Sequence, residues 1–368
     1  CEFRVRLGES VSEALTPIGT KNATNDHAER DTVFGAGPWS SNETCESGFR
    51  FAYIELTTPG VYAELRSVAA IMIYRDIDYK GHFECSDPLI EKIYDTAAYT
   101  VHLNMQRYLW DGIKRDRLVW AGDMNTEVAA ILAVFGYNEV VPKSLDLVRD
   151  VTPAGSPMNG LSSYNLWWLI CHRDWYMGTG DYDYLRAQRE YIAEMLSRYV
   201  TFVNDDGSEA MPDGRFFDWP TNDDIHAKHC GLQGLMRYAM NAGGEIMKAL
   251  GESAVAESCY LASEKLGRHI PAFCENKQSS AMLVMGSLIE PEKCAVDCIE
   301  KGGARGLSTF LGYYTLSALA KAGHYSSALD TMREYWGGML KMGATTFWED
   351  FNVEWTENSA PIDDVVPL

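Results

Sequence analysis

The strongest constraint on the fold is a series of helix-like segments that begins after Ser86 and continues almost to the end of this 368-residue chain. The first segment repeats apolar residues at positions i and i+4, from Leu89 to Val101, which is the spacing of one helix face. Asp87 and Pro88 open the series as an N-cap and a first helical residue. Glycine or proline separates most segments, as at Gly251 and Gly323. Ten helices are predicted, over 87–109, 122–135, 139–150, 161–179, 182–203, 226–250, 253–272, 290–300, 307–322 and 325–340.

Helices of similar length that are joined in pairs by short loops favour stacked helical hairpins. The helices show no fixed sequence period, which argues against a regular solenoid. We therefore predict a mainly α-helical protein with a six-hairpin (α/α) barrel. Six hairpins need twelve helices, so the ten found predict a barrel that is incomplete at its C-terminal end. An open seam is then expected between 87–109 and 325–340, with Glu349 on a poorly supported loop.

The region before the helices has the alternation of apolar and polar residues that is typical of strands. Four strands are predicted, around residues 3–7, 49–54, 61–65 and 68–74, with a long polar loop over 20–45. Four strands make only part of a sandwich, and more of this domain is expected upstream. We therefore divide the chain into a partial β-sandwich domain, residues 1–84, and an (α/α) barrel catalytic domain, residues 85–368.

Composition narrows the possible partners. A net charge of −20 argues against nucleic acid and anionic membranes, and favours a neutral substrate. The sequence has no run of 18 apolar residues, so no membrane-spanning segment is predicted. The odd count of nine cysteines fits a disulfide framework poorly, and Cys294 and Cys298 are interpreted as buried thiols. The chain starts at Cys1, which indicates a processed product or an excised part of a protein.

Chemically dense residues gather in four stretches between helices. Residues 110–123 hold three carboxylates, three cations and two tryptophans. The others are the aromatic stretches 163–168 and 216–220 and the tail segment 343–351, which carries Trp348 and Glu349. Loops of this kind open at one end of a helical barrel, so the four stretches are expected to converge on one pocket.

Carboxylates mixed with aromatic side chains are what a sugar site needs. Tryptophan and tyrosine faces stack on the apolar surface of a pyranose, and two carboxyl groups act as acid and base at the glycosidic bond. Trp168 and Trp175 are interpreted instead as core residues. A metal site at 226–230 lacks a second ligand cluster, and the glycines at 302–306 lack the preceding strand of a nucleotide site. No metal and no cofactor are therefore expected.

The stretches 111–123 and 343–349 resemble the catalytic domain of bacterial α-L-rhamnosidases of the inverting type. The likeness extends over almost the whole chain, through further matching stretches at 48–51, 83–88, 302–314 and 335–349. The resemblance implies a six-hairpin α/α barrel preceded by β-sandwich domains. It also implies a glycoside hydrolase whose partner is a rhamnose-containing glycan or glycoside. Secretion or a periplasmic location in a bacterium is expected rather than a cytoplasmic one.

The resemblance also implies roles for single residues. Asp116 stands where the family has its general acid, and Glu349 where it has its general base. Further residues are expected to bind the sugar; they are Asp111, Arg115, Trp120, Asp123, Tyr164, Trp167, Asp218, Trp219 and Trp348.

Two departures from the family pattern keep alternatives open. The acid position usually carries glutamate, and Asp116 is one methylene shorter. Family members also have a histidine motif and closing helices after the Trp348-Glu349 pair. We predict hydrolysis of terminal α-L-rhamnose with inversion, Asp116 protonating the leaving oxygen and Glu349 activating water. The alternatives are a barrel hydrolase for a different sugar and a non-catalytic carbohydrate-binding relative.

Overall fold

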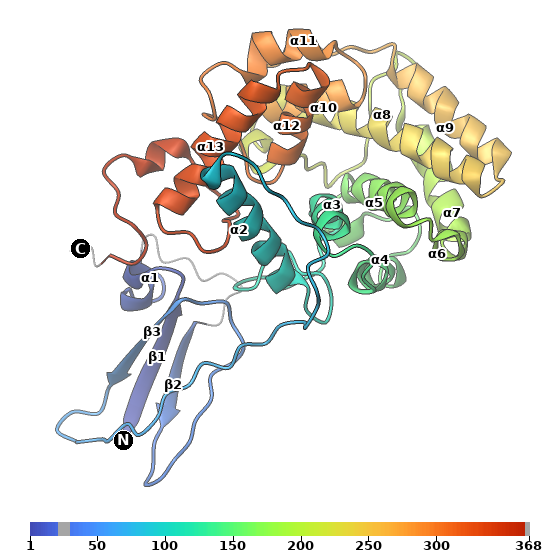
Figure 1. The fold of residues 1–368 in the computed structure, drawn as a ribbon. Coiled ribbons are helices and arrows are strands. Elements are labelled where there is room, and N and C mark those ends of the chain that lie inside the picture. The colour runs from blue at the N-terminus through green and yellow to red at the C-terminus, as the bar shows by residue number, and fades with distance from the viewer. Residues whose placement is uncertain (21–29, 365–368) are drawn as a thin grey trace.

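The N-terminal part of the protein is a small β-sheet. The computed structural model describes residues 1–20 and 30–364 (Figure 1). The sheet is antiparallel with the strand order β2-β1-β3, and its strands are β1 Glu2–Gly8, β2 Asp31–Gly35 and β3 Phe51–Leu56. A short helix, α1 Val11–Leu15, follows β1 in the sequence. In the central strand, Val5 pairs with Thr32 on one side and with Ile54 on the other. The predicted strands at 3–7 and 49–54 are confirmed.

The described residues form one sheet. Two predictions for this region are wrong. Segments 61–65 and 68–74 form no strand, and most of their side chains are exposed. A strand needs a neighbour that accepts its backbone hydrogen bonds, and apolar alternation alone does not supply one. The predicted loop 20–45 contains β2, while residues 21–29 within it lie outside the described residues.

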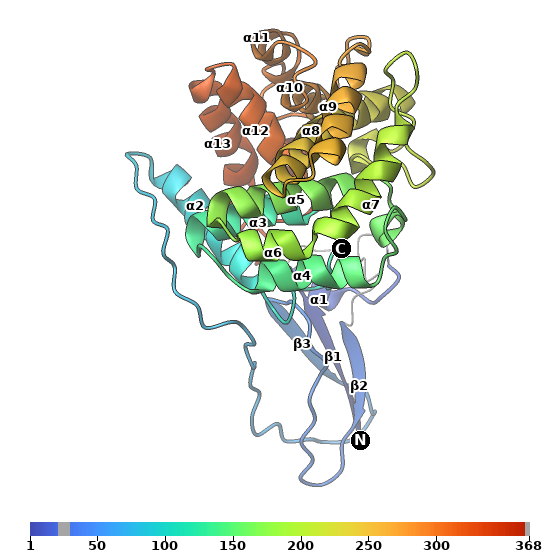
Figure 2. The ribbon, with the colours of Figure 1, turned by 90° about the vertical axis from the view of Figure 1, so that its right-hand side faces the viewer.

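Residues 57–86 lead from the sheet to the helical part without regular structure, as an extended trace along its edge (Figure 2). Near its end, the amides of Lys80 and Gly81 both donate to the Val134 carbonyl, at 2.7 and 2.8 Å. A Cβ at Gly81 would lie 1.9 Å from the Ala133 carbonyl oxygen, so this close approach requires glycine. The segment is thereby fixed to the barrel just before the first barrel helix.

From Pro88 onward the described chain is mainly helical. The helices are α2 Pro88–Asn104, α3 Met124–Val134, α4 Val140–Asp150, α5 Tyr164–Thr179, α6 Tyr182–Ala187, α7 Arg189–Tyr199, α8 Ile225–Ala249, α9 Ser253–Leu266, α10 Lys277–Met285, α11 Pro291–Cys294, α12 Gly312–Lys321 and α13 Tyr325–Lys341. Short 3₁₀ turns lie at Met158–Gly160, Val200–Phe202, Trp219–Thr221 and Val353–Thr356, and a π-helical turn at Ala295–Ile299. Helices α3, α5, α8, α10 and α12 pack in succession as an inner layer, with α4, α7, α9 and α11 outside them (Figure 1). This arrangement agrees with the predicted six-hairpin barrel.

Helix α10 is absent from the ten predicted helices. Eight of its residues, from Lys277 to Val284, are buried. A helix that is covered on every side has no polar face, so it lacks the 3.6-residue alternation by which surface helices are recognised. Its N-cap is nevertheless regular, because the Asn276 side chain accepts a hydrogen bond from the Ser279 amide at 2.9 Å.

Helices α2 and α13 contact each other directly, contrary to the predicted open seam. Arg333 pairs with Asp87 at 2.6 Å, and Leu89 packs on Gly337, where a Cβ would lie 3.2 Å from the leucine methyl. Beside this contact lies a cleft of about 650 Å³ between α2, α13 and residues 353–357. None of the predicted catalytic or sugar-binding residues lines that cleft.

The core fills the space between the two helical layers. Trp168 and Trp175 are fully buried within it, which confirms them as core residues. Cys294 and Cys298 are buried thiols, as predicted. Among the described residues, no helix is both long and apolar enough to cross a membrane.

Candidate active site

The predicted catalytic residue Asp116 lies in a tightly closed loop between α2 and α3. The Asp111 amide donates to the Leu118 carbonyl at 3.1 Å, and the Leu118 amide donates to the Asp111 carboxylate at 3.0 Å. Downstream, the Asn159 side chain accepts from the Ala121 amide and donates to the Val119 carbonyl, both at 3.0 Å. These contacts give residues 110–122 a defined shape without regular structure.

The tip of this loop has an unusual backbone. Asp116 and Arg117 have φ angles of 53° and 54°, in the left-handed region. Such a conformation costs on the order of 1–3 kcal/mol for a residue other than glycine, and strained residues cluster at functional sites. Aspartate tolerates this region better than longer side chains, because its short polar group can bond locally. The backbone thus gives a physical reason for aspartate at position 116.

Two of the three cations in this loop point toward the N-terminal region. Lys114 forms ion pairs with Glu9 and Glu13 at 2.9 and 2.7 Å. Arg117 donates to the Glu46 carbonyl at 2.6 Å and pairs with the Glu46 carboxylate at 2.8 Å. These contacts anchor the loop on the sheet side of the molecule and remove two positive charges from the carboxylate cluster.

The third cation, Arg115, joins the loop to the tail segment. Its Nη2 donates to both carboxylate oxygens of Glu349, at 2.9 and 3.1 Å. The two residues are 234 positions apart in the sequence. The structure therefore brings the two segments that carry the predicted acid and base into direct contact.

The tail segment itself is held at several points. The Phe347 amide donates to the Thr100 hydroxyl at 3.0 Å, and the Tyr335 hydroxyl donates to the Phe351 carbonyl at 2.8 Å. Trp348 packs partly buried against Phe351. The expectation of a poorly supported loop is wrong.

Several carboxylates face one another where the two segments meet. Burial, followed by the charges of Asp116 and Glu349, raises the pKa of Asp111 to about 6. Burial, followed by the charges of Asp111 and Glu349, raises the pKa of Asp123 to about 8. Both side chains retain some exposed surface. The cluster is therefore a poorly hydrated group of carboxyls, in which Asp123 keeps its proton near neutral pH.

Glu127 belongs to the same cluster and was missed in the sequence. It follows Asp123 by four residues in α3, which places both side chains on one helix face. Burial, then the charges of Asp123 and Asp111, raises the pKa of Glu127 well above its ordinary value. Counting one helical turn from Asp123 would have found it, since α3 was predicted.

An aromatic wall stands beside the carboxylates. Trp120 meets Tyr164 edge-on with ring centroids 6.0 Å apart, and Phe216 lies 6.2 Å from Tyr164 and 5.1 Å from Trp219. Trp219 is 65% exposed, so its ring is available to a ligand. Tyr164 packs on Gly122 so closely that a Cβ there would lie 2.4 Å from the ring. Trp120, Tyr164 and Trp219 thus come from three separate segments to one wall.

Two predicted sugar-binding residues lie behind this wall. The Asp218 side chain is fully buried and accepts hydrogen bonds from the Trp219 amide at 2.9 Å and the Ser308 hydroxyl at 2.7 Å. Burial raises the pKa of Asp218 to about 7, although both hydrogen bonds oppose the shift. Trp167 is 1% exposed and stacks on Tyr314 in the core. Both side chains are therefore buried behind the aromatic wall and support it. Direct binding of a sugar by Asp218 and Trp167 stays a prediction.

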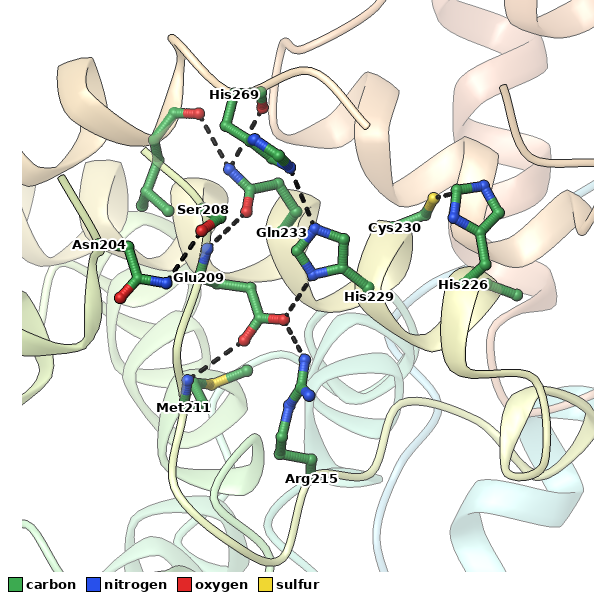
Figure 3. Close-up of polar contacts among 12 residues, drawn as sticks. Asn204, Ser208, Glu209, Met211, Arg215, His226, His229, Cys230, Gln233 and His269 are labelled. Carbon is green, nitrogen blue, oxygen red and sulfur yellow. Dashed lines mark hydrogen bonds and ion pairs between the residues drawn. The ribbon is translucent and has the colours of Figure 1, made fainter. Parts of the chain in front are cut away.

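The histidines and the cysteine near the start of α8 form two separate sets of contacts (Figure 3). His229 bonds the buried Glu209 carboxylate at 2.8 Å and the His269 ring at 3.1 Å, whereas Cys230 lies 3.7 Å from His226. In the part of the chain that the structure describes, no three histidine, cysteine or acidic side chains are placed to hold a metal ion. The His229 cluster instead ties the loop before Trp219 to the end of α9.

Comparisons with known proteins indicate the family that the chain resembles. Residues 78–233 match the family model of the bacterial alpha-L-rhamnosidase 6 hairpin glycosidase domain. An alpha-L-rhamnosidase from Formosa agariphila is 26% identical over 102 residues, which are 28% of this chain and 10% of that protein. The predicted resemblance to this family is thereby confirmed, and the chain spans only a small part of that curated relative.

Solved structures share the fold. A rhamnosidase from Klebsiella oxytoca with rhamnose bound superposes with a TM-score of 0.76 at 19% identity, covering 98% of this chain and 79% of that one. A GH78-family rhamnosidase from Bacillus sp. GL1 gives a TM-score of 0.76 at 18% identity, over 99% of this chain and 41% of that one. The likeness covers the sheet as well as the barrel, because almost the whole chain superposes.

Proposed function

We propose that this chain, a relative of the bacterial α-L-rhamnosidases through its six-hairpin glycosidase domain, is a glycoside hydrolase that releases terminal α-L-rhamnose with inversion. One observation carries the proposal. Carboxylates from two segments that are far apart in the sequence meet beside an aromatic wall, through the contact of Arg115 with Glu349. A paired set of carboxyl groups next to stacking aromatics is the arrangement that hydrolysis of a glycosidic bond needs.

In the proposed mechanism, Asp116 donates a proton to the glycosidic oxygen as the bond to the anomeric carbon breaks. Glu349 accepts a proton from a water molecule that attacks this carbon from the opposite face. Inverting glycosidases keep such a pair roughly 6.5–9.5 Å apart, which leaves room for the water. The product is β-L-rhamnose, formed in a single displacement.

The remaining residues are proposed to bind the sugar. Asp111 and Asp123 hydrogen-bond its hydroxyls, and their raised pKa values let them act as donors as well as acceptors. Trp120 and the exposed Trp219 stack on its apolar surface. The rhamnose-bound relative from Klebsiella oxytoca supports this class of ligand. An acidic site beside aromatic rings also fits a neutral sugar better than an anionic one.

Hydrolysis of 4-nitrophenyl α-L-rhamnoside, followed by proton NMR of the first product, tests the proposal. We expect release of nitrophenol and β-L-rhamnose as the first anomer. An α anomer as the first product would contradict inversion. Turnover of a matched α-L-fucoside without turnover of the rhamnoside would favour a barrel hydrolase for a different sugar. Saturable rhamnose binding without any turnover would favour a carbohydrate-binding relative.

A further inference from the structure

Arg115 makes an ion pair unlike those of its neighbours. One guanidinium nitrogen contacts both oxygens of Glu349, at 2.9 and 3.1 Å, and spans the gap between two separately folded segments. Lys114 and Arg117, the other cations of the same loop, bind carboxylates of the N-terminal region instead. Arg115 is directed at Glu349, the predicted general base.

The other groups that face Glu349 are acidic or neutral. The charge of Glu349 acts on Asp111 in the loop, on Asp123 at the start of α3 and on the Tyr164 hydroxyl in α5, and it raises the pKa of each of these groups. Asp350 follows it in the tail segment. Each carboxylate in this set repels a negative charge on Glu349. A general base must stay unprotonated, so the site needs a nearby positive charge.

The geometry of the pair leaves Glu349 able to act. A carboxylate has about four lone-pair positions, two on each oxygen. Arg115 occupies one position on each oxygen and leaves the others for a water molecule. A contact to both oxygens also fixes the plane of the carboxylate more firmly than a contact to one oxygen.

We infer that Arg115 is a positioning residue, which holds Glu349 ionised and oriented toward the attacking water. This inference rests on the proposed function, in which Glu349 is the general base. It assigns Arg115 to the base, whereas the sequence led us to expect that Arg115 binds the sugar.

The test is the pH profile of kcat/KM for 4-nitrophenyl α-L-rhamnoside in Arg115→Gln, Arg115→Lys and the matched control Arg117→Gln. A cation within about 4–6 Å of a carboxylate shifts its titration by about 1–3 pH units, and partial exposure reduces the effect. We expect the acidic limb to move upward by about one pH unit in Arg115→Gln, with kcat recovering at higher pH and KM within threefold of wild type. Arg115→Lys, which keeps the charge, should move the limb by less than half as much. Arg117→Gln should leave the limb in place, because Arg117 pairs with Glu46.

Other outcomes overturn the inference. A limb that stays in place in Arg115→Gln, with kcat lowered at every pH, would show that Arg115 does not keep the base ionised. A raised KM as the main effect would show that Arg115 binds the sugar. A second readout does not need turnover: a carbon-13 NMR titration of protein labelled at glutamate carboxyls, with the Glu349 signal assigned by its loss in Glu349→Gln. If the wild type is inactive but the Glu349 signal still shifts in Arg115→Gln, the proposed function is refuted and the role of the ion pair is retained. If the signal does not shift, that role is refuted.

Discussion

The loop that carries Asp116 and the tail segment that carries Glu349 face the same site with different surroundings. Backbone pairing around Asp111 and the Asn159 side chain hold the loop in place. The tail segment is held through Phe347, Trp348 and Phe351, while the Glu349 side chain remains 61% exposed. The first segment is built into the barrel, and the second lies over it.

This difference separates two electrostatic environments within one site. Burial raises the pKa values of Asp111 and Asp123 on the barrel side. On the tail side, an exposed carboxylate has a guanidinium on both of its oxygens. Enzymes that need an acid and a base together use such contrasts between environments to divide the two roles. We therefore assign proton retention to the barrel side and proton acceptance to the tail side.

The segment around Gly48 touches both sides. The Gly48 amide donates to the Ile113 carbonyl at 2.9 Å, and the Arg50 guanidinium donates to the Gly343 carbonyl at 2.7 Å. A Cβ at Gly48 would lie 2.7 Å from the Ile113 side chain, so glycine is needed for this approach. The N-terminal sheet region thus contributes to the relative placement of the two segments.

The largest effect is expected from removing the base. In Glu349→Gln, the side chain keeps its size but no longer accepts a proton from water. A positioned general base contributes about 10²–10⁴ in rate, so kcat should fall by that factor while KM changes little. Steady-state kinetics with the aryl rhamnoside measure both values. Turnover within threefold of wild type would remove Glu349 from the base role and end the contrast between the two segments.

A smaller, substrate-dependent effect is expected from removing the acid. Asp116→Asn cannot protonate a leaving group. Rhamnosides with alkyl or sugar leaving groups should lose about 10²–10⁴ in kcat, whereas a 4-nitrophenyl rhamnoside needs little protonation and should lose less than tenfold. The ratio of the two losses is the measurement. Equal losses on both substrates would contradict an acid role, and a loss of folded protein in circular dichroism would point to the strained loop.

Only part of this architecture follows from local sequence patterns. Helices with one apolar face were predictable, because burial on one side leaves a periodic stripe. Helix α10 was not, because it is covered all round. The alternating segments 61–65 and 68–74 resemble strands but have no partner strand in the described chain. Strand formation depends on a second segment, which a local pattern does not specify.

The site shows the same limit. Asp116 and Glu349 could be singled out from composition and from family resemblance, since each lies in an aperiodic stretch rich in charge or aromatics. The pairing of Arg115 with Glu349 spans 234 positions and depends on the barrel, so no spacing rule predicts it. The burial of Asp218 was not predictable either, because its side chain accepts a hydrogen bond from Ser308, which is 90 positions away.

The smallest expected effect is on the pH dependence of stability, which should differ between a variant in the loop segment and a variant in the tail segment. In Asp123→Asn, we expect stability to fall less between pH 5 and pH 8 than it does in the wild type. The folded protein holds the Asp123 proton up to about pH 8, whereas an unfolded aspartate releases it near pH 3.9. Between these values the folded state binds more protons than the unfolded state, so stability decreases as pH rises. Above about pH 8 both states are ionised and this contribution becomes constant.

Each pH unit within that window changes the free energy of unfolding by at most about 1.4 kcal/mol for one group, so the difference between variant and wild type should reach about 1–4 kcal/mol at pH 8. Urea unfolding at pH 5, 6, 7 and 8 measures it, from the midpoints at constant slope. Glu127 contributes a pH dependence of the same sign, and this contribution is smaller in Asp123→Asn, because the charge of Asp123 raises the pKa of Glu127 in the wild type. Asp350→Asn, on the exposed tail segment, is the matched control and should parallel the wild type. If Asp123→Asn also parallels the wild type, the barrel side does not retain a proton, and the division of roles between the two segments fails.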